Sequence, residues 1–370
     1  MKIERIEVFG VAVPLIGEYA TSYQSESSQK SVVIRITDHE GRIGLGNVDP
    51  VAGYSVDSIE DTLRALRSRF APLVIGMDSS NIHLLLQKME AEVPGYLDAK
   101  AAIEMACVDL AARSLGLPVH TYLGGAVKDQ LLFNAWVGIL PPDEAASETA
   151  EWQRRGFRSA KVKVGGGIEA DRDRISAIRQ AVGSDFQLRI DANAGYDADT
   201  SIRLVRMLEP FNLQLFEQPV PADDLAGMKR VRCESGGIPI MADESVLDHA
   251  SLIRLIQAEA ADIVKVKVMK QGGLYKTRSM IATAEAAGLR CVLGHGFGLG
   301  INTMAEIMLA ATSSNVMDGI ECVGPLKTAD DIVVAKLDLN SGSLPLPSGP
   351  GLGVTLDDDK LARYQMTPPL

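Results

Sequence analysis

The chain has 370 residues, of which 46% are hydrophobic and 23% are charged, which is ordinary for a globular protein. A chain of this length is too long to form a single small hydrophobic core, which indicates a large barrel, two domains, or both. The formal net charge of −11 argues against nucleic-acid binding, because phosphate contacts need a basic surface. No apolar run reaches the roughly 18 residues of a membrane span, and the N-terminus lacks the apolar core of a signal peptide. We therefore expect a cytoplasmic protein with no nucleic acid and no membrane among its partners.

The first part of the chain is predicted to form a sheet followed by helices. Strand patterns cover residues 3–13, 31–37 and 43–47. The polar stretch 16–30 between the first two strands is predicted to be a loop. Helical spacing covers residues 58–70, 81–91 and 97–115. Strands followed by helices favour an α+β domain, which we place at residues 1–125.

From about residue 130, short apolar strands alternate with amphipathic helices at a nearly constant spacing. The strands are expected to end at Val137, Lys163, Asp191, Glu217, Asp243, Lys267 and Leu293, with a last one near Cys322. This pitch suits a doubly wound sheet or a closed barrel, and polar residues after many strands favour the barrel. We therefore expect an α/β fold, a (β/α)7-8 TIM-like barrel over residues 126–338 with an N-terminal α+β capping domain. The Gly- and Pro-rich tail, residues 339–370, is expected to return to that domain and complete it.

Three of the predicted strands end in a carboxylate, at Asp191, Glu217 and Asp243. A single acid at such a position is often a helix cap or part of a surface turn. Three at equivalent positions would converge at the mouth of a barrel, where they would repel one another and raise their pKa values. A hard divalent cation such as Mg²⁺ would relieve this repulsion and keep positions open for a substrate or water.

Lysines lie at the ends of strands on both sides of these acids. Lys161 and Lys163 are two residues apart, so they share one face of their strand, unless they are solvated residues of an edge strand. Lys267 follows the sixth strand and would face Lys163 across the mouth. A metal-bound substrate carboxylate would place its α-carbon between these two amines, and the metal would stabilise the enediolate. A lysine pKa is about 10.4 in water and must be lowered for such a base, for example by the neighbouring charge of Lys161.

The motifs K-x-K, D-x-N, E-Q-P, A-D-E-S and V-K-x-x-K-x-G-G together resemble the enolase superfamily, specifically the muconate lactonizing enzyme subgroup of the mandelate racemase/muconate lactonizing enzyme family. Segments that begin at Ala101, Pro118 and Glu321 extend the resemblance over essentially the whole chain. The resemblance implies Mg²⁺, with Mn²⁺ as a possible substitute. The implied residues are Asp191, Glu217 and Asp243 as metal ligands, Lys163 and Lys267 as the acid/base pair, Lys161 as electrostatic support, and Asn193 and Glu244 as groups beside the metal ligands.

The same resemblance implies that the first domain caps the barrel and that its loops set specificity. Here those loops would be residues 16–30 and 47–54, with Tyr23 and Tyr54 as candidate substrate contacts. A small carboxylate substrate and a homo-oligomeric assembly are also implied.

Several residues depart from the pattern of the family. Lys265 stands where relatives commonly have a neutral amide. It could form a buried ion pair with an acid such as Glu217, or it could be an additional cation that alters base strength or binds a second anion of the substrate. His295 and Phe297 follow the seventh strand, where many relatives have an acidic residue. His295 could contact substrate or make a structural hydrogen bond.

The eighth strand carries a further departure. Glu321 and Val323 replace the D-x-D that binds the ammonium group of the ligand in dipeptide epimerases, which argues against a dipeptide substrate. Glu321-x-x-Gly-Pro-Leu is more similar to the muconate cycloisomerases. Three functions therefore stay open. They are an isomerase (cycloisomerase, racemase or epimerase), a lyase that dehydrates a hydroxy acid, and a binding protein without turnover.

Overall fold

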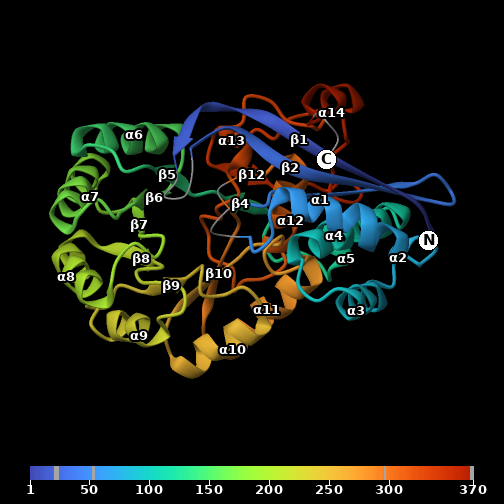
Figure 1. Ribbon diagram of the computed structural model, residues 1–370. Helices are drawn as coiled ribbons and strands as arrows, with labels where there is room; N and C mark the ends of the chain where they lie inside the picture. Colours follow the sequence, from blue (N-terminus) through green and yellow to red (C-terminus); the bar gives the residue numbers. More distant parts are fainter. Residues whose placement is uncertain (21–24, 52–54, 296, 367–370) are drawn as a thin grey trace.

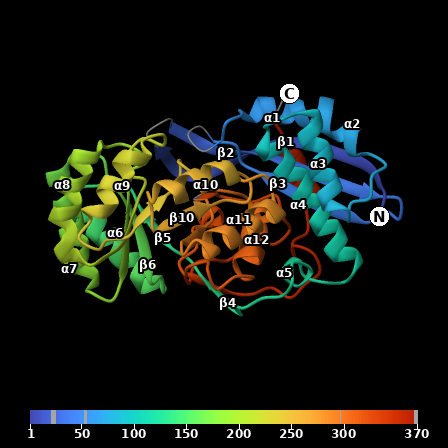
Figure 2. The same cartoon turned by 90° about the horizontal axis from the view of Figure 1, so that it is seen from below.

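The computed structural model describes residues 1–20, 25–51, 55–295 and 297–366 and has an α/β architecture. A curled parallel sheet, with helices around its outer side, lies beside an antiparallel sheet and helices formed by the N-terminal part of the chain (Figure 1). Figure 2 shows the same arrangement from below, with the N-terminal strands at the end opposite α7 and α8. No helix of the described residues is long and apolar enough to cross a lipid bilayer.

The N-terminal sheet has three antiparallel strands in the order β1-β2-β3. They are β1 (Ile3–Ala20), β2 (Ser25–Asp38) and β3 (Ile43–Val48). The prediction of a loop over residues 16–30 was wrong, because β1 and β2 continue as a hairpin as far as the pair Ala20 and Ser25. Backbone pairing extends the two strands here although their sequence lacks an apolar face. Tyr23 and Tyr54 lie outside the described residues, and the role of both segments in specificity remains a prediction.

Helices cover one face of this sheet. They are α1 (Ile59–Ala65), a π-helical turn η1 (Leu66–Phe70), α2 (Ala71–Val74), α3 (Ile82–Glu92), α4 (Leu97–Ser114) and α5 (Val119–Tyr122). The buried helix α4 packs directly on β3, and Gly46 permits this close approach. A Cβ atom at Gly46 would lie 2.0 Å from the carbonyl oxygen of Ala102. The predicted helices at 81–91 and 97–115 are confirmed.

The parallel sheet contains seven strands in the order β5 to β11. They are β5 (Ala135–Val137), β6 (Ser159–Lys163), β7 (Gln187–Asp191), β8 (Leu213–Glu217), β9 (Ile240–Ala242), β10 (Ile263–Val266) and β11 (Arg290–Leu293). Every predicted strand end from Val137 to Leu293 agrees to within one residue. The helices between and after them are α6 (Pro142–Arg155), α7 (Ile168–Val182), α8 (Ala198–Leu208), the 3₁₀ turn η2 (Glu209–Phe211), α9 (Leu225–Cys233), α10 (His249–Ala258), α11 (Leu274–Ala286) and α12 (Gly300–Ala310).

The predicted eighth strand near Cys322 is not a regular strand. The backbone of residues 316–321 instead bridges the two edges of the parallel sheet. Met317 and Glu321 donate hydrogen bonds to the carbonyls of Cys291 and Leu293 on one edge, and Asn134 donates to Ile320 on the other. These bonds complete the barrel through single bridges rather than a ladder, because the segment is too irregular to pair continuously.

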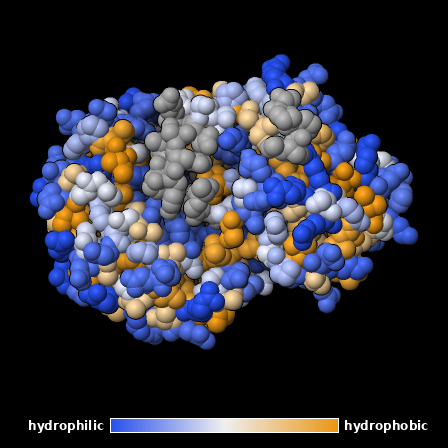
Figure 3. Space-filling model, in the orientation of Figure 1, coloured by the Kyte–Doolittle hydropathy of each residue, from blue (hydrophilic) through white to orange (hydrophobic). Residues whose placement is uncertain are grey.

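The last part of the chain contacts β4 and the N-terminal sheet. Its strand β12 (Ser343–Pro345) pairs with β4 (Gln130–Leu132), and its helix α14 (Asp358–Tyr364) packs beside β1. The backbone of Met366 donates a hydrogen bond to Gly10 of β1. On the face seen in Figure 3, hydrophobic residues occur as separate patches among hydrophilic ones.

The interior of the barrel is layered. Along each strand, alternate side chains point into the barrel. Four of these inward side chains form a small apolar cluster, which contains Leu215, Met241, Ile263 and Val292. The inward residues two positions further along β8, β9 and β10 are Glu217, Asp243 and Lys265. Because strand side chains repeat with a period of two, an apolar floor is followed by a charged layer toward the carboxyl ends of the strands.

Candidate active site

The predicted acids lie at the carboxyl ends of three adjacent strands. Asp191 ends β7 and is paired in register with Glu217, which ends β8, while Asp243 directly follows β9. All three side chains are buried. The right-handed α/β connection places equivalent strand ends at one rim, so these three acids lie at the same end of the barrel.

Asp191 and Glu217 share one ammonium group. The Nζ of Lys161 lies 3.1 Å from Asp191 Oδ2, 2.9 Å from Glu217 Oε2 and 2.6 Å from Glu321 Oε2. Although burial alone would raise the pKa of Asp191, Lys163 and Lys161 lower it to about 2. Burial and the neighbouring Asp191 raise the pKa of Glu217 to about 7. The ionised form of Glu217 is therefore poorly stabilised, mainly because the group is buried.

Asp243 is bound by a different set of lysines. Lys267 Nζ lies 2.7 Å from Asp243 Oδ2, and Lys270 Nζ lies 2.7 Å from Asp243 Oδ1. Lys270 also donates to the backbone carbonyl of Asp243 at 2.7 Å. Burial opposes ionisation of Asp243, but the two lysines lower its pKa well below the usual value.

Lys163 and Lys267 lie on opposite sides of this row of acids. Lys163 ends β6 and donates to Asp191 Oδ2 at 2.6 Å, whereas Lys267 directly follows β10 and contacts Asp243. Strands β7, β8 and β9 separate them in the sheet. Burial, and the neighbouring ammonium groups of Lys270 and Lys265, lower the pKa of Lys267 to about 7 against the effect of Asp243. A lysine with such a pKa can accept a proton near neutral pH.

Lys265 lies in the middle of the charged layer. Its Nζ is 3.1 Å from Glu217 Oε1 and also contacts Glu321, which Arg189 approaches to 3.4 Å. Burial alone would lower the pKa of Lys265, but Glu217 and Glu321 raise it. Of the two interpretations of Lys265 given above, the buried ion pair is the one that matches these contacts.

Asn193 and Glu244 contact each other beside the acids. The Asn193 side-chain amide donates to Glu244 Oε1 at 3.1 Å, and its backbone amide donates to Asp191 Oδ1 at 2.9 Å. Asn193 has a φ of 44°, a left-handed conformation that is costly outside glycine and often occurs at functional sites. The Oε2 atom of Glu244 is buried and has no hydrogen-bond partner among the described residues.

These carboxylates fit a hard divalent cation by donor type, burial and charge. No three acidic, histidine or cysteine side chains of the described residues already surround a common point as metal ligands. Lysine ammonium groups occupy the spaces between the acids instead, at the distances given above. The raised pKa of Glu217 and the unpartnered oxygen of Glu244 both indicate that further positive charge would be bound favourably here.

His295 makes structural contacts. Its Nε2 lies 2.6 Å from Asn302 Nδ2 and 3.5 Å from Asp49 Oδ2, while its Nδ1 accepts a hydrogen bond from the Phe297 amide. Asn302 and Asp49 join the barrel helix α12 to the end of β3, so His295 links the barrel with the N-terminal region. The Phe297 ring lies beside Lys327, with 4.2 Å between its centroid and Nζ.

Three residues of the site were not singled out by the sequence. Lys270 was part of a quoted motif, but nothing indicated its contact with Asp243. Gln218 accepts hydrogen bonds through Oε1 from the amides of Asp243 and Ser245, and so orders the segment that follows β9. Lys327, in the short helix α13 (Gly324–Lys327), is buried near the lysines of the mouth. No spacing rule could reveal Lys327, because it reaches the site from an irregular connection.

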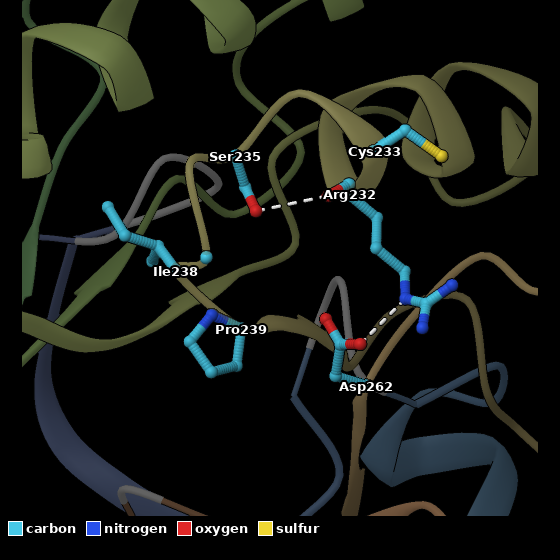
Figure 4. Close-up of a pocket in the computed structure, with 7 residues that line it drawn as sticks. Arg232, Cys233, Ser235, Ile238, Pro239 and Asp262 are labelled. Atoms are coloured by element: carbon cyan, nitrogen blue, oxygen red, sulfur yellow. Dashed lines mark hydrogen bonds and ion pairs between the residues drawn. The ribbon is translucent and has the colours of Figure 1, made fainter.

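A surface depression of about 420 Å³ lies elsewhere (Figure 4). Its residues precede β9 and β10 in the chain, so it opens at the amino ends of the strands, away from the acids. Arg232 Nε donates to Asp262 at 2.6 Å across it. In parallel α/β barrels chemistry occurs at the carboxyl ends, and this depression is therefore separate from the candidate active site.

A curled parallel sheet with a mouth of buried acids and lysines, beside an antiparallel N-terminal sheet, defines an α/β-barrel enzyme. Residues 5–124 match the mandelate racemase/muconate lactonizing enzyme N-terminal domain, and residues 144–360 match the enolase C-terminal domain-like family. The chain belongs to the mandelate racemase/muconate lactonizing enzyme family of the enolase superfamily, as the sequence predicted. The fold prediction is likewise confirmed.

Relatives along the whole chain are isomerases. An N-succinyl-L-Arg/Lys racemase of Bacillus cereus is 32% identical, with 98% of this chain and 97% of the relative covered. Its crystal structure has a TM-score of 0.95, at 31% identity and coverage of 99% and 98%. A chloromuconate cycloisomerase of Pseudomonas putida is 34% identical, with coverage of 98% and 99%.

A structure of a dipeptide epimerase of Enterococcus faecalis, complexed with Mg and the dipeptide L-Leu-L-Tyr, has a TM-score of 0.92 at 30% identity. It covers 96% of this chain and 100% of that one. The prediction of an isomerase is confirmed, and the comparisons give no support to the lyase alternative.

Proposed function

We propose that the protein is an Mg²⁺-dependent racemase or epimerase that removes the proton α to a carboxylate of a small acid or amino-acid derivative. The proposal depends above all on the positions of Lys163 and Lys267, which lie on either side of three buried acids. One base on each side of an α-carbon is what inversion of a stereocentre requires. The racemase and epimerase names of relatives that cover nearly the whole chain give further support.

Asp191, Glu217 and Asp243 would bind the metal, with Glu244 and Asn193 beside them. When bound, the divalent cation supplies charge that stabilises an enediolate. Lys163 and Lys267, which now contact Asp191 and Asp243, would be released toward the substrate. Lys161 stays at the floor of the site, where its contact with Glu321 keeps a positive charge close to the acids.

In one direction Lys267 accepts the α-proton at Nζ, and Lys163 donates a proton from its own Nζ to the opposite side of the carbon. In the other direction the roles are exchanged. Lys267 is suited to the first role because its lowered pKa leaves much of it neutral near pH 7. Lys267 is buried, which keeps bulk water away from its amine, whereas a third of the Lys163 side chain is exposed.

A cycloisomerase is the second candidate. Two points favour it: the segment Glu321-x-x-Gly-Pro-Leu resembles that of the muconate cycloisomerases, and a chloromuconate cycloisomerase is 34% identical. Glu321 contacts Lys161, Lys265 and Arg189, so it is not available to an ammonium group of a substrate. These contacts argue against a dipeptide with a free N-terminus in this position.

The test is exchange of the α-proton with deuterium from solvent, followed by NMR on both enantiomers of N-acylamino acids in the presence of Mg²⁺. We expect exchange and racemisation with the unaltered protein, and a loss of racemisation of about 10²–10⁴-fold in Lys163→Ala and in Lys267→Ala. Lys229→Ala removes an exposed lysine of α9 and serves as the matched control. Racemisation at the normal rate in either active-site variant would contradict the proposal. Cyclisation of a muconate without α-proton exchange would favour the second candidate.

A further inference from the structure

Glu104 joins helix α4 of the N-terminal region to the barrel helix α11. The residue is buried, and each of its carboxylate oxygens accepts one backbone amide at 2.8 Å, Oε2 from Leu274 and Oε1 from Tyr275. These amides belong to the first turn of α11, where backbone N–H groups have no acceptor within the helix. Gly273, the residue before the helix, has no side chain with which to cap them. A carboxylate from the N-terminal part of the chain therefore caps a helix of the barrel.

The backbone before α11 is shaped to admit this carboxylate. Gly273 has a φ of 121°, and a Cβ atom at this position would lie 2.6 Å from Cδ of Glu104. Burial raises the pKa of Glu104 to about 7, although the two amides and Lys276 lower it. The ionised carboxylate is costly in this place, which indicates a role other than packing.

The loop that precedes α11 begins at Lys267, the proposed base. In this loop, residues 267–273, the amide of Gly273 donates to the carbonyl of Val268 at 2.9 Å, and the amide of Gln271 donates to that of Lys267 at 3.1 Å. The side-chain oxygen of Gln271 also accepts the amide of Lys267 at 2.5 Å. Because these bonds tie the end of the loop to its beginning, a shift of the first turn of α11 would move the backbone of Lys267.

The other proposed acid/base residue, Lys163, is held by contacts from α7. The amide of Gly165, in the turn after Lys163, donates to Asp171 Oδ2 at 2.9 Å. Arg174 donates to Asp171 Oδ1 at 2.6 Å and to the carbonyl of Lys163 at 3.4 Å. Because Asp171 and Arg174 both belong to α7, these bonds order the backbone around Lys163 from the barrel itself.

We propose that Glu104 is a positioning residue for the reaction, which fixes the 267–273 loop through α11 and so places the amine of Lys267, but not that of Lys163, beside the substrate. This inference rests on the proposed function, because it concerns one of the two proton-transferring lysines. Glu104 acts through the loop and not on the substrate. Misplacing a reacting group by about 1 Å can lower a rate about 10²-fold, so a helix cap remote from the chemistry can control proton transfer.

The experiment measures exchange of the α-proton with solvent deuterium separately for the two enantiomers of the N-acylamino acid that exchanges fastest in the unaltered protein, with Mg²⁺ present. Lys163→Ala identifies the enantiomer that Lys267 deprotonates, because that enantiomer still exchanges. In Glu104→Gln an NH₂ group replaces one oxygen and cannot accept an amide. We expect exchange of the Lys267-dependent enantiomer to fall about tenfold relative to the other. A merely structural role of Glu104 would lower both rates equally.

Asp109→Asn is the matched control. Asp109 is also a buried acid of α4 whose two oxygens accept backbone amides, from Leu45 at 2.9 Å and from Leu352 at 2.7 Å. Those amides belong to β3 and to the tail rather than to the 267–273 loop or α11. We expect this variant to leave the ratio of the two exchange rates within about twofold of that of the unaltered protein.

A second measurement does not depend on turnover. Hydrogen exchange of the backbone amides of residues 267–275, followed by mass spectrometry, should be faster in Glu104→Gln and unchanged in Asp109→Asn. Gly273→Ala displaces the same contact from the other side and should show both effects. It replaces Glu104→Gln if circular dichroism shows that variant to be unfolded.

Three results would overturn the inference. They are an unchanged ratio of the two exchange rates in Glu104→Gln, an equal fall of both rates in that variant, and the same change of the ratio in Asp109→Asn. Absence of α-proton exchange in the unaltered protein contradicts the proposed function instead, and exchange of the backbone amides then decides whether Glu104 holds the loop. Normal α-proton exchange in the unaltered protein, with an unchanged ratio in Glu104→Gln, contradicts this inference alone.

Discussion

Lys267 binds both oxygens of Asp243, at 2.8 Å from Oδ1 and 2.7 Å from Oδ2, with both side chains buried. This contact joins the proposed base Lys267 to the proposed metal ligand Asp243. The protonation state of Lys267 therefore depends on the charge of Asp243. Burial is the main cause of the lowered pKa of Lys267, and Lys270 adds to it. The chemistry should therefore depend on pH near neutrality.

We expect the rate constant kcat/KM in the direction that uses Lys267 as base to rise about tenfold per pH unit below about pH 7 and then to level off. The sign follows from the mechanism, because protonated Lys267 cannot accept a proton and its pKa is about 7. Racemisation rates measured from pH 5.5 to 9 test this. Lys267→Arg retains the positive charge but stays protonated, so it should be inactive in this direction throughout. A flat profile below pH 7 would contradict the assignment.

Mg²⁺ should stabilise the protein against heat. A ligand that binds only the folded state adds about 2.7 kcal/mol at a hundred times its Kd, which should raise Tm by a few degrees. Calorimetry with and without Mg²⁺, and after chelation by EDTA, measures the shift. Glu217→Gln should abolish most of it, because Glu217 lies between the other two acids in strand order. If Mg²⁺ leaves the Tm of the unaltered protein unchanged, these acids are not a metal site.

Arg189 of β7 joins the irregular segment 316–321, which closes the barrel, to the parallel sheet. Its guanidinium donates to the carbonyls of Asp318 and Gly319 at 2.7 Å each and to Gln214 Oε1 at 2.6 Å, and the side chain is fully buried. Arg189→Met would leave these acceptors unpaired and Glu321 with one cation fewer. We expect the free energy of unfolding to fall by about 3–5 kcal/mol, measured by urea denaturation.

The matched control is Arg206→Met in α8. Arg206 also forms an ion pair, with Glu234, but both side chains are largely exposed. Its loss should cost less than about 1 kcal/mol. Similar losses in the two variants would show that Arg189 does not join the irregular eighth segment to the sheet.

The parts of this structure that sequence could predict are those that follow local periods. Lys163, Asp191 and Glu217 end strands of constant spacing, and a period of two places Lys161 and Lys163 on one face. Lys327 shows what periodicity misses, because its place depends on contacts with rings from distant strands. The length of the β1–β2 hairpin and the irregular eighth segment were missed for a related reason. Both are determined by backbone pairing with remote parts of the chain rather than by apolar patterns.

Asp98 lies outside the candidate active site, and its burial makes the stability of the fold depend on pH. It lies in the first turn of α4, is buried, and has an Oδ1 without a hydrogen-bond partner among the described residues. Burial, with smaller effects of Asp57 and Asp49, raises its pKa to about 7 against the hydrogen bond from Ser55. The folded state therefore retains a proton that the unfolded chain loses at about pH 4. Stability from this group is present below pH 4 and is lost as the pH rises to about 7.

Asp98→Asn removes this titration while keeping the shape of the side chain. We expect the variant to be more stable than the unaltered protein by about 4 kcal/mol at pH 8 but by only about 1.5 kcal/mol at pH 5, because between these pH values the folded state also loses the proton that the unfolded chain loses at about pH 4. Urea denaturation at the two pH values measures the difference. Asp359→Asn removes the same charge from an exposed position of α14 and should leave stability within about 0.5 kcal/mol at both. A gain for Asp98→Asn that is equal at pH 5 and pH 8 would contradict the raised pKa, because only an ionised buried carboxylate makes the gain depend on pH.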